Sequence, residues 1–154
     1  MKVIFLDFDG VLNSDTYYEE HNWSAPFIDE SRLVLLKRIV DATDAKIVLS
    51  TSWKMYWEKD PALCKSEGKY INEVFAKYGM YIYDKTIDID YDAECRVDEI
   101  NDWLDQNQVD KYVAIDDMNL KLPVEHFVRT KAHILGIDEE NVQRVISLLN
   151  EGSV

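Results

Sequence analysis

Short apolar runs alternate with stretches of helical periodicity along most of this chain, and this alternation constrains the fold more than any other feature. VIFL at residues 3–6 is an unbroken apolar run, typical of a strand buried on both faces. In residues 29–42, by contrast, Leu33, Leu36 and Ile39 recur at helical spacing. Strands that alternate with helices form a parallel sheet covered on both sides. The sequence therefore predicts an α/β fold.

The expected elements follow from the same patterns. We expect strands at residues 3–8, 46–51, 80–84, 111–117 and 125–130. We expect helices at residues 29–42, 66–79, 96–107 and 138–151. Asp29 and Asp138 are the expected N-caps of the first and last helix, and Gly79 closes the second. Together these elements predict a doubly wound, Rossmann-like parallel sheet of about five strands with helices on both faces.

The chain shows no repeat, linker or targeting segment, so we expect residues 1–154 to form one domain. The start MKVIFLDFDG has too short an apolar stretch for a signal peptide, and no apolar run is long enough to span a membrane. We therefore expect a cytoplasmic protein with no membrane partner. Cys64 and Cys95 form no CxxC pair and are expected to be reduced thiols.

The charge balance is strongly acidic. Asp and Glu number 30 against 17 Lys and Arg, for a formal net charge of −13. A surface of this sign repels a phosphate backbone, so nucleic-acid binding is disfavoured. A pocket where several carboxylates meet would instead attract a metal cation.

Polar residues follow three of the predicted strands, at the point where each strand ends. Ligands of parallel α/β sheets bind outside the carboxyl ends of the strands, so these residues could share one site. They are Asp7 and Asp9 after the first strand, Ser50 and Thr51 after the second, and Asp116 and Asp117 after the fourth.

Asp7 and Asp9 lie two residues apart, so an extended chain would turn both toward one ligand, and Gly10 lets the chain bend away. Such a pair could bind a divalent cation, or one carboxylate could attack an electrophile while the other transfers a proton. The alternatives are a turn with exposed aspartates or a calcium loop. A calcium loop would need an acid at Phe5 and a glutamate at Thr16, so the pattern excludes it.

The other strand-end residues also allow two interpretations each. The Thr51 hydroxyl could hold a phosphate oxygen, or it could simply form a turn, which is the commoner use of such a residue. Asp116 and Asp117 would repel each other unless a cation lies between them, or they could serve as an N-cap or a solvated turn.

DFDGVLN, KIVLST and YVAIDD resemble, in order, the first, second and fourth motifs of the haloacid dehalogenase (HAD) superfamily. LSTSWK, RVDEINDWL, YVAIDD and FVRT followed by Gly136 are similar to small cap-less HAD domains, including those of multidomain RNA-repair proteins. This resemblance runs over almost the whole chain. It implies that Asp7 is a nucleophile that forms an aspartyl-phosphate, and that Asp9 is the general acid and then the general base.

The resemblance also implies the remaining roles. Thr51, with Ser52 beside it, would bind the phosphoryl group, and Arg96 would be the neutralising cation of the third motif, with Lys54 and Lys85 as further candidates. Mg²⁺ would be the cofactor. Its implied ligands are the Asp7 and Asp116 carboxylates and the Asp9 backbone carbonyl, with Asp117 behind a metal-bound water.

Family members carry cap domains after the first motif or between the second and third. Here residues 14–28 are too few for a domain and residues 53–94 have room for one helix, one strand and loops, so we expect no large cap and an open site. The expected function is Mg²⁺-dependent hydrolysis of a small phosphate monoester such as a nucleotide. The alternatives are a silent regulatory module that binds Mg²⁺ and phosphate, and a phosphatase of nucleic-acid 3′ ends.

The two loops near the expected site are rich in aromatic residues. Their rings could stack on a base or sugar of the substrate. They could also pack the loops onto the domain, which is the interpretation we favour from sequence. The residues are Tyr17, Tyr18, Trp23, Phe27, Trp53, Tyr56 and Trp57.

Overall fold

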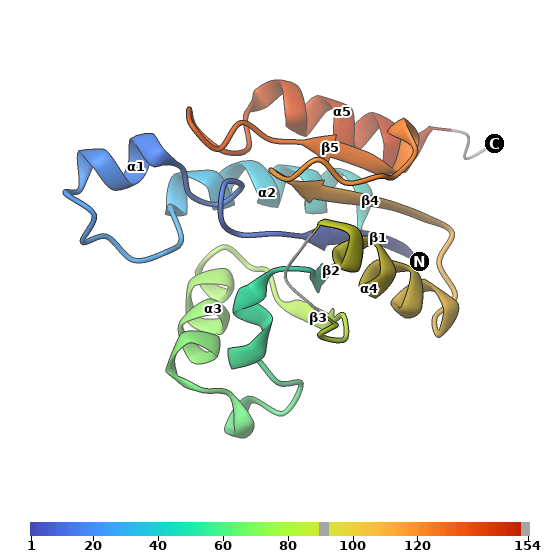
Figure 1. Cartoon of the computed structure of the whole chain (residues 1–154), viewed down its shortest axis with the longest axis horizontal. Coiled ribbons are helices and arrows are strands. Elements are labelled where there is room, and N and C mark those ends of the chain that lie inside the picture. Colours follow the sequence, from blue (N-terminus) through green and yellow to red (C-terminus); the bar gives the residue numbers. More distant parts are fainter. Residues whose placement is uncertain (90–92, 152–154) are drawn as a thin grey trace.

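The computed structural model describes residues 1–89 and 93–151, and in them five parallel strands form one sheet (Figure 1). The strand order is β3-β2-β1-β4-β5, and every neighbouring pair is parallel. The strands are β1 (Lys2–Leu6), β2 (Lys46–Leu49), β3 (Ile82–Lys85), β4 (Lys111–Asp116) and β5 (Phe127–Arg129). This confirms the predicted α/β fold and places β1 at the centre of the sheet.

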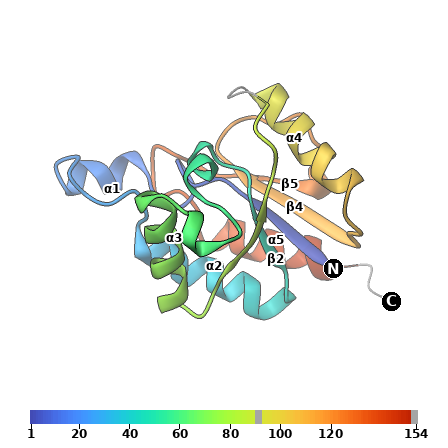
Figure 2. The same cartoon turned by 90° about the horizontal axis from the view of Figure 1, so that it is seen from below.

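Helices cover both faces of the sheet (Figure 2). The α-helices are α1 (Asp15–Glu20), α2 (Glu30–Thr43), α3 (Ser66–Lys77), α4 (Ala93–Asp105) and α5 (Glu139–Asn150). Short 3₁₀ helices are η1 (Ser52–Tyr56), η2 (Pro61–Leu63) and η3 (Val124–His126). The core of one face takes side chains from α2, α3 and α5, and that of the other takes them from α4.

The alternation within β1 explains why both faces are covered. Ile4 and Leu6 belong to the core on the side of α2 and α5, whereas Val3 and Phe5 belong to the core on the side of α4, and all four are fully buried or nearly so. A strand with apolar residues on both sides must be shielded on both sides, since each buried CH₂ contributes about 0.8 kcal/mol.

The helix ends agree with the sequence. The Asp29 side chain accepts a hydrogen bond from the Ser31 backbone N–H, and Asp138 and Asn141 form a capping box at the start of α5. Gly79 follows α3 in the left-handed region, with φ +70°.

One helix was not predicted, and several elements differ from the prediction in their bounds. The helix α1 was not expected, because its six residues are too few to show a helical period and none of them is buried; the Ser14 hydroxyl caps it. The strand β3 begins at Ile82, the first residue that pairs with β2, rather than at residue 80. Between β1 and α2 the described chain adds only α1, and between β2 and β3 it adds α3 with two 3₁₀ helices, so no large cap domain is present, as expected. Within the described residues, no helix is both long enough and apolar enough to cross a lipid bilayer.

Candidate active site

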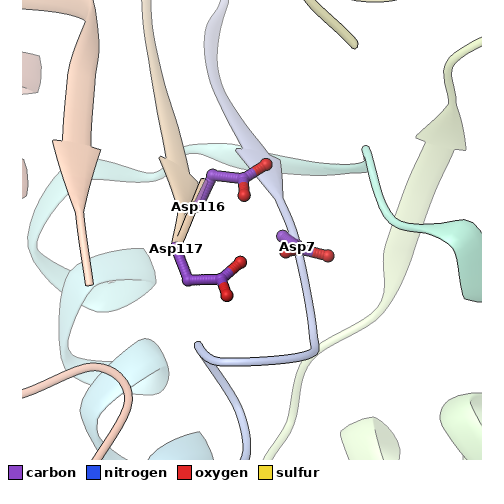
Figure 3. Close-up of side chains that lie close together, drawn as sticks. All are labelled: Asp7, Asp116 and Asp117. Carbon is purple, nitrogen blue, oxygen red and sulfur yellow. The ribbon is translucent and has the colours of Figure 1, made fainter. Parts of the chain in front are cut away.

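Strand register brings the acids of the first and fourth motifs together. Leu6 is the partner of Ile115 where β1 pairs with β4, so the next residues along the chain, Asp7 and Asp116, lie side by side at the carboxyl end of the sheet. The Asp7 backbone N–H extends the ladder by donating to the Ile115 carbonyl oxygen at 3.1 Å. Figure 3 shows Asp116 and Asp117 extending from the end of β4 toward Asp7. One carboxylate oxygen from each of the three lies within 4.8 Å of those from the other two.

Asp7 and Asp116 are buried, which disfavours their charged forms. Burial raises the pKa of Asp7 well above its ordinary value, and the nearby charge of Asp116 raises it further, although Arg96 opposes both effects. Burial likewise raises the pKa of Asp116, again against the opposing charge of Arg96. Like charges in a dry site favour the protonated form of one member. The pair is therefore suited to a bound cation, which would keep both groups ionised.

Arg96 is the cation that the structure brings to this cluster. It lies in the first turn of α4, is 8% exposed, and places Nη1 2.9 Å from Asp116 Oδ2 and 3.3 Å from Asp7 Oδ2. Burial works against its charge, but Asp7 and Asp116 outweigh this effect and raise the pKa of Arg96 above its ordinary value. The guanidinium stays charged within the site.

Lys54 and Lys85, the alternative candidates for the role of Arg96, make hydrogen bonds elsewhere. Lys54 Nζ donates to the Thr86 hydroxyl, the Ile87 carbonyl and Glu99 Oε1, at 2.8 to 3.0 Å. A lysine ammonium has three protons, so these three acceptors use all of them. Lys85 Nζ contacts two backbone carbonyls and Glu58 in the same way. The geometry favours Arg96 over both lysines.

Asp9 lies apart from the three clustered carboxylates. The strand ends at Leu6, so Asp7 is buried while Asp9 is exposed, and the Asp9 side chain is not among the carboxylates that meet. Its Oδ1 accepts from Asn13 Nδ2 and its Oδ2 accepts from Trp53 Nε1, each at 3.1 Å. Both oxygens are thus held in place, which suits a residue that must transfer a proton along a fixed direction.

Asn13 was not among the residues predicted for the site, and Trp53 was considered only as an aromatic residue of a nearby loop. Asn13 is 2% exposed and also accepts from the Gly10 backbone N–H and donates to the Phe27 carbonyl. Trp53 stacks on Phe27 with ring centroids 4.0 Å apart. Asn13 stands in the DFDGVLN motif, and Trp53 stands in LSTSWK directly after Thr51 and Ser52. Both motifs pointed to the site, but neither pointed to a contact with Asp9.

Gly10 allows the first motif to approach Asp117. Its φ is +81°, and a Cβ built at this position would lie 2.6 Å from both Cγ and Oδ2 of Asp117. The Gly10 carbonyl accepts from the Thr130 hydroxyl at 2.6 Å, which ties this turn to the chain after β5. Only glycine fits such a backbone and such a contact without displacement.

Gly10→Ala is therefore expected to lower Mg²⁺ affinity as well as stability, because the new methyl group must push the Asp117 carboxylate aside. The matched control is Gly79→Ala, which has a similar φ of +70° but meets only the flexible end of Lys37 at 3.4 Å. Both variants should lose about 1–3 kcal/mol of stability from backbone strain. Titration calorimetry with Mg²⁺ should show weaker binding for Gly10→Ala alone; equal affinities in the two variants would contradict this account.

Thr51 and Ser52 lie at the carboxyl end of β2, next to β1. The Ser50 backbone N–H donates to the Leu6 carbonyl at 2.9 Å, so Thr51 follows at the level where β1 has already delivered Asp7. Thr51 is 1% exposed, and its hydroxyl accepts from the Trp53 N–H at 3.4 Å as the cap of η1, while Ser52 is half-buried. Turn formation is thus what the Thr51 contact shows, and a phosphoryl contact for Thr51 or Ser52 stays a prediction.

The donor set fits a hard divalent ion. Three carboxylates supply oxygen ligands alone, the kind that Mg²⁺ and Ca²⁺ prefer, and burial of Asp7 and Asp116 gives an ion more to stabilise than exposed acids would. Asp7, Asp116 and Asp117 are the side chains that would hold it.

The raised pKa values of Asp7 and Asp116 predict a definite pH dependence of stability without metal. In the unfolded chain these groups ionise near pH 3.9, but the folded chain keeps protons on the pair to higher pH. Their contribution to the free energy of unfolding is therefore fully present below about pH 3.9 and is lost as pH rises through the raised pKa values. In EDTA, the free energy of unfolding measured with urea should show this loss, and Asp7→Asn should show less of it. Mg²⁺ binding should release protons from this pair. If calorimetry in buffers of different ionisation enthalpy shows no proton release, the assignment of Asp7 and Asp116 as ligands is contradicted.

The chain matches a family model over residues 3–142, described as the HAD domain in Swiss Army Knife RNA repair proteins. The matched range includes every predicted site residue, from Asp7 to Asp117. Neither the comparison with curated proteins nor the comparison with solved structures gave a match. The family match confirms the resemblance drawn from the motifs, and the five parallel strands agree with it. Because the match covers most of its length, the chain belongs to the family of HAD domains found in Swiss Army Knife RNA repair proteins.

Proposed function

We propose that this HAD domain is a Mg²⁺-dependent phosphohydrolase that cleaves small phosphate monoesters through an aspartyl-phosphate on Asp7. The observation that carries the proposal is the buried Asp7 carboxylate, set between Asp116, Asp117 and the Arg96 guanidinium. A buried acid among like charges is costly for stability and is explained if the site serves a reaction.

In the first half of the reaction, a carboxylate oxygen of Asp7 attacks phosphorus. The bond from phosphorus to the leaving oxygen breaks, the phosphoryl group is carried on Asp7, and Asp9 gives its proton to the leaving oxygen. In the second half, the Asp9 carboxylate takes a proton from a water molecule whose oxygen attacks phosphorus. Inorganic phosphate leaves and the Asp7 carboxylate is restored. Asn13 and Trp53 keep the Asp9 carboxylate in one orientation through both steps.

Neutralisation of charge must account for much of the rate. Uncatalysed hydrolysis of phosphate monoesters is so slow that acceleration can reach about 10²¹-fold. Arg96 supplies one positive charge from within the cluster. Mg²⁺, held by Asp7, Asp116 and Asp117, would supply the positive charge that lets an anionic substrate approach these carboxylates. Thr51, with Ser52, is the proposed hydroxyl contact for the phosphoryl group.

A small pocket at Asp117 supports a small substrate. A pocket of about 220 Å³ opens beside the acids and is lined in part by Asp9, Gly10, Asn13 and Asp117. No large cap domain closes over it in the described chain. A nucleotide or a compound of similar size is the substrate class we propose.

A phosphatase for nucleic-acid ends is the second candidate, favoured by one observation beyond the family description. A second pocket, of about 590 Å³, also reaches Asp117 and is lined by Arg129, Lys131 and His133. This is a local gathering of basic groups on a chain with a net charge of −13. The family description places related domains in RNA repair proteins. If the end of a strand is the substrate, its hydrolysis should weaken steeply with salt, while that of a mononucleotide should not.

A single assay tests the proposal against the silent alternative. Hydrolysis of an aryl phosphate and of a panel of nucleotides is followed with Mg²⁺ and with EDTA. We expect turnover with Mg²⁺ and none with EDTA. Absence of turnover on every monoester, with Mg²⁺ still bound by calorimetry, would overturn the enzyme and support a regulatory module.

A further inference from the structure

We propose that Tyr18 and Trp23 form a stacking platform that binds the nucleobase of a nucleotide substrate. This inference rests on the proposed function and narrows its substrate class. It also corrects our preference from sequence, in which all aromatic residues of the two loops pack onto the domain.

Trp23 is the feature that needs an explanation. It is 64% exposed, an unusual state for so large an apolar side chain. Its ring stacks on that of Tyr18 with centroids 5.5 Å apart and planes within 7° of parallel. One side of the indole is thus backed by Tyr18, and most of the Trp23 side chain is exposed to a ligand.

The segment that carries the two rings is fixed rather than loose. The Trp23 backbone N–H donates to the Tyr18 carbonyl at 2.7 Å, and both Asn22 and Trp23 have positive φ, at 54° and 59°. A bulky aromatic residue in this region of backbone conformation is strained. The segment is tied to the body where the Asp15 N–H donates to the Ala132 carbonyl at 2.9 Å. The chain therefore holds Trp23 in a costly conformation that also exposes it.

The platform faces the candidate active site. Tyr18 and Trp23 line the same pocket of about 220 Å³ as Asp9 and Asp117. Burial, and then the charge of Asp9, raise the pKa of Tyr18 to about 12, which agrees with its position beside the proposed general acid. In Figure 1, α1 projects at the edge where β1 delivers its carboxyl end. A phosphate at Asp7 and a ring on Trp23 could belong to one molecule.

The neighbouring aromatic residues show what packing looks like in this protein. Phe27 stacks on Trp53 at 4.0 Å and meets Tyr70 edge-on at 5.0 Å, and Trp57 is 3% exposed. For these residues the packing interpretation agrees with the structure. Trp23 differs in exposure and in its place on a pocket wall.

The shape of the platform selects a flat ligand. Two nearly parallel rings present a plane, whereas a quaternary ammonium group is bound by rings set at angles around it. Stacking of a base on an aromatic side chain contributes about 1–3 kcal/mol. A purine or pyrimidine ring attached to the scissile phosphate through a sugar is the ligand that this pocket fits.

The kinetic test compares substrates that differ in the ring alone. The ratio of kcat/KM for a nucleoside monophosphate to that for ribose 5-phosphate is measured for the wild type, Trp23→Ala and Trp23→Phe. We expect the ratio to fall about 5- to 100-fold in Trp23→Ala and to be largely kept in Trp23→Phe. The matched control is Tyr81→Ala, which removes another exposed aromatic ring, 60% exposed, at the opposite end of the sheet, and should keep the wild-type ratio. An unchanged ratio in Trp23→Ala would overturn the platform.

A binding measurement separates this inference from the proposed hydrolysis. The four tryptophan indole N–H signals are followed by NMR in Asp7→Asn with Mg²⁺ while the same nucleotide or ribose 5-phosphate is added. Trp23 is assigned by the signal lost in Trp23→Phe. We expect the nucleotide, and not ribose 5-phosphate, to shift the Trp23 signal. A shift of the Trp23 signal without turnover in the wild type would support the platform and reject the proposed hydrolysis. Turnover without a shift would support the hydrolysis and reject the platform.

Discussion

Asp7→Asn is expected to lose hydrolysis of every phosphate monoester by on the order of 10⁴-fold or more, while the metal-free protein becomes more stable. The amide has the shape of the carboxylate but cannot carry a phosphoryl group. It also removes one buried charge from beside Asp116 and Asp117, and with it the cost that raises the pKa of Asp7. Loss of catalysis together with a gain in stability is typical of a residue kept for reaction chemistry.

Steady-state kinetics with Mg²⁺ and urea unfolding in EDTA measure the two effects on the same preparation. Asp105→Asn is the matched control, since Asp105 is exposed at the end of α4 and the change removes the same charge. We expect the control to resemble the wild type in both respects. Retained turnover in Asp7→Asn would remove the nucleophile assignment, and a loss of stability would show that Asp7 is a structural acid.

Arg96→Met is expected to lower the free energy of unfolding in EDTA by about 3–5 kcal/mol, the usual cost of removing one partner of a buried ion pair. Nη1 of Arg96 is the cationic contact of both Asp7 and Asp116, so the variant leaves two buried carboxyl groups without it. Mg²⁺ should recover more stability in the variant than in the wild type, because the ion takes over the neutralising role. Catalysis should remain impaired even with saturating Mg²⁺.

The matched control for this variant is Arg38→Met, which breaks an exposed pair with Glu139 on the surface. Little change in unfolding is expected there, since water and salt screen such pairs. Equal unfolding curves for Arg96→Met and the wild type in EDTA would mean that Arg96 does not compensate the cluster. A loss that Mg²⁺ does not reduce would mean that the carboxylates do not bind the ion.

The fold could be predicted because its central strands carry unbroken apolar runs. VIFL and YVAI carry apolar side chains toward both faces, which requires helices on both sides of a parallel sheet. The meeting of Asp7 with Asp116 follows from strand ends once β1 and β4 are neighbours. The strand order itself is set by how the helices pack, which no local pattern reports.

The position of Asp9 could not be predicted, because the rule of alternation fails where the strand stops. β1 ends at Leu6 and the chain turns at Gly10, so Asp7 and Asp9 have different surroundings despite their spacing. The partners of Asp9 come from residues 4 and 44 positions away, and the second depends on the placement of η1. The choice among Arg96, Lys54 and Lys85 likewise depended on which side chains were already saturated by other acceptors.

The buried pair of Lys54 and Glu99, with side chains only 5% and 2% exposed, has a consequence for how the domain meets its substrate. Lys54 directly follows Trp53, which orients Asp9, and Glu99 lies three residues after Arg96 on α4. The ion pair therefore fixes the segment that orients Asp9 relative to the helix that carries Arg96 when the chain folds. These side chains lose their conformational entropy on folding, before any ligand arrives. Ligand binding therefore has few side chains left to immobilise. Such a domain binds its substrate in a preformed site and does not close around it.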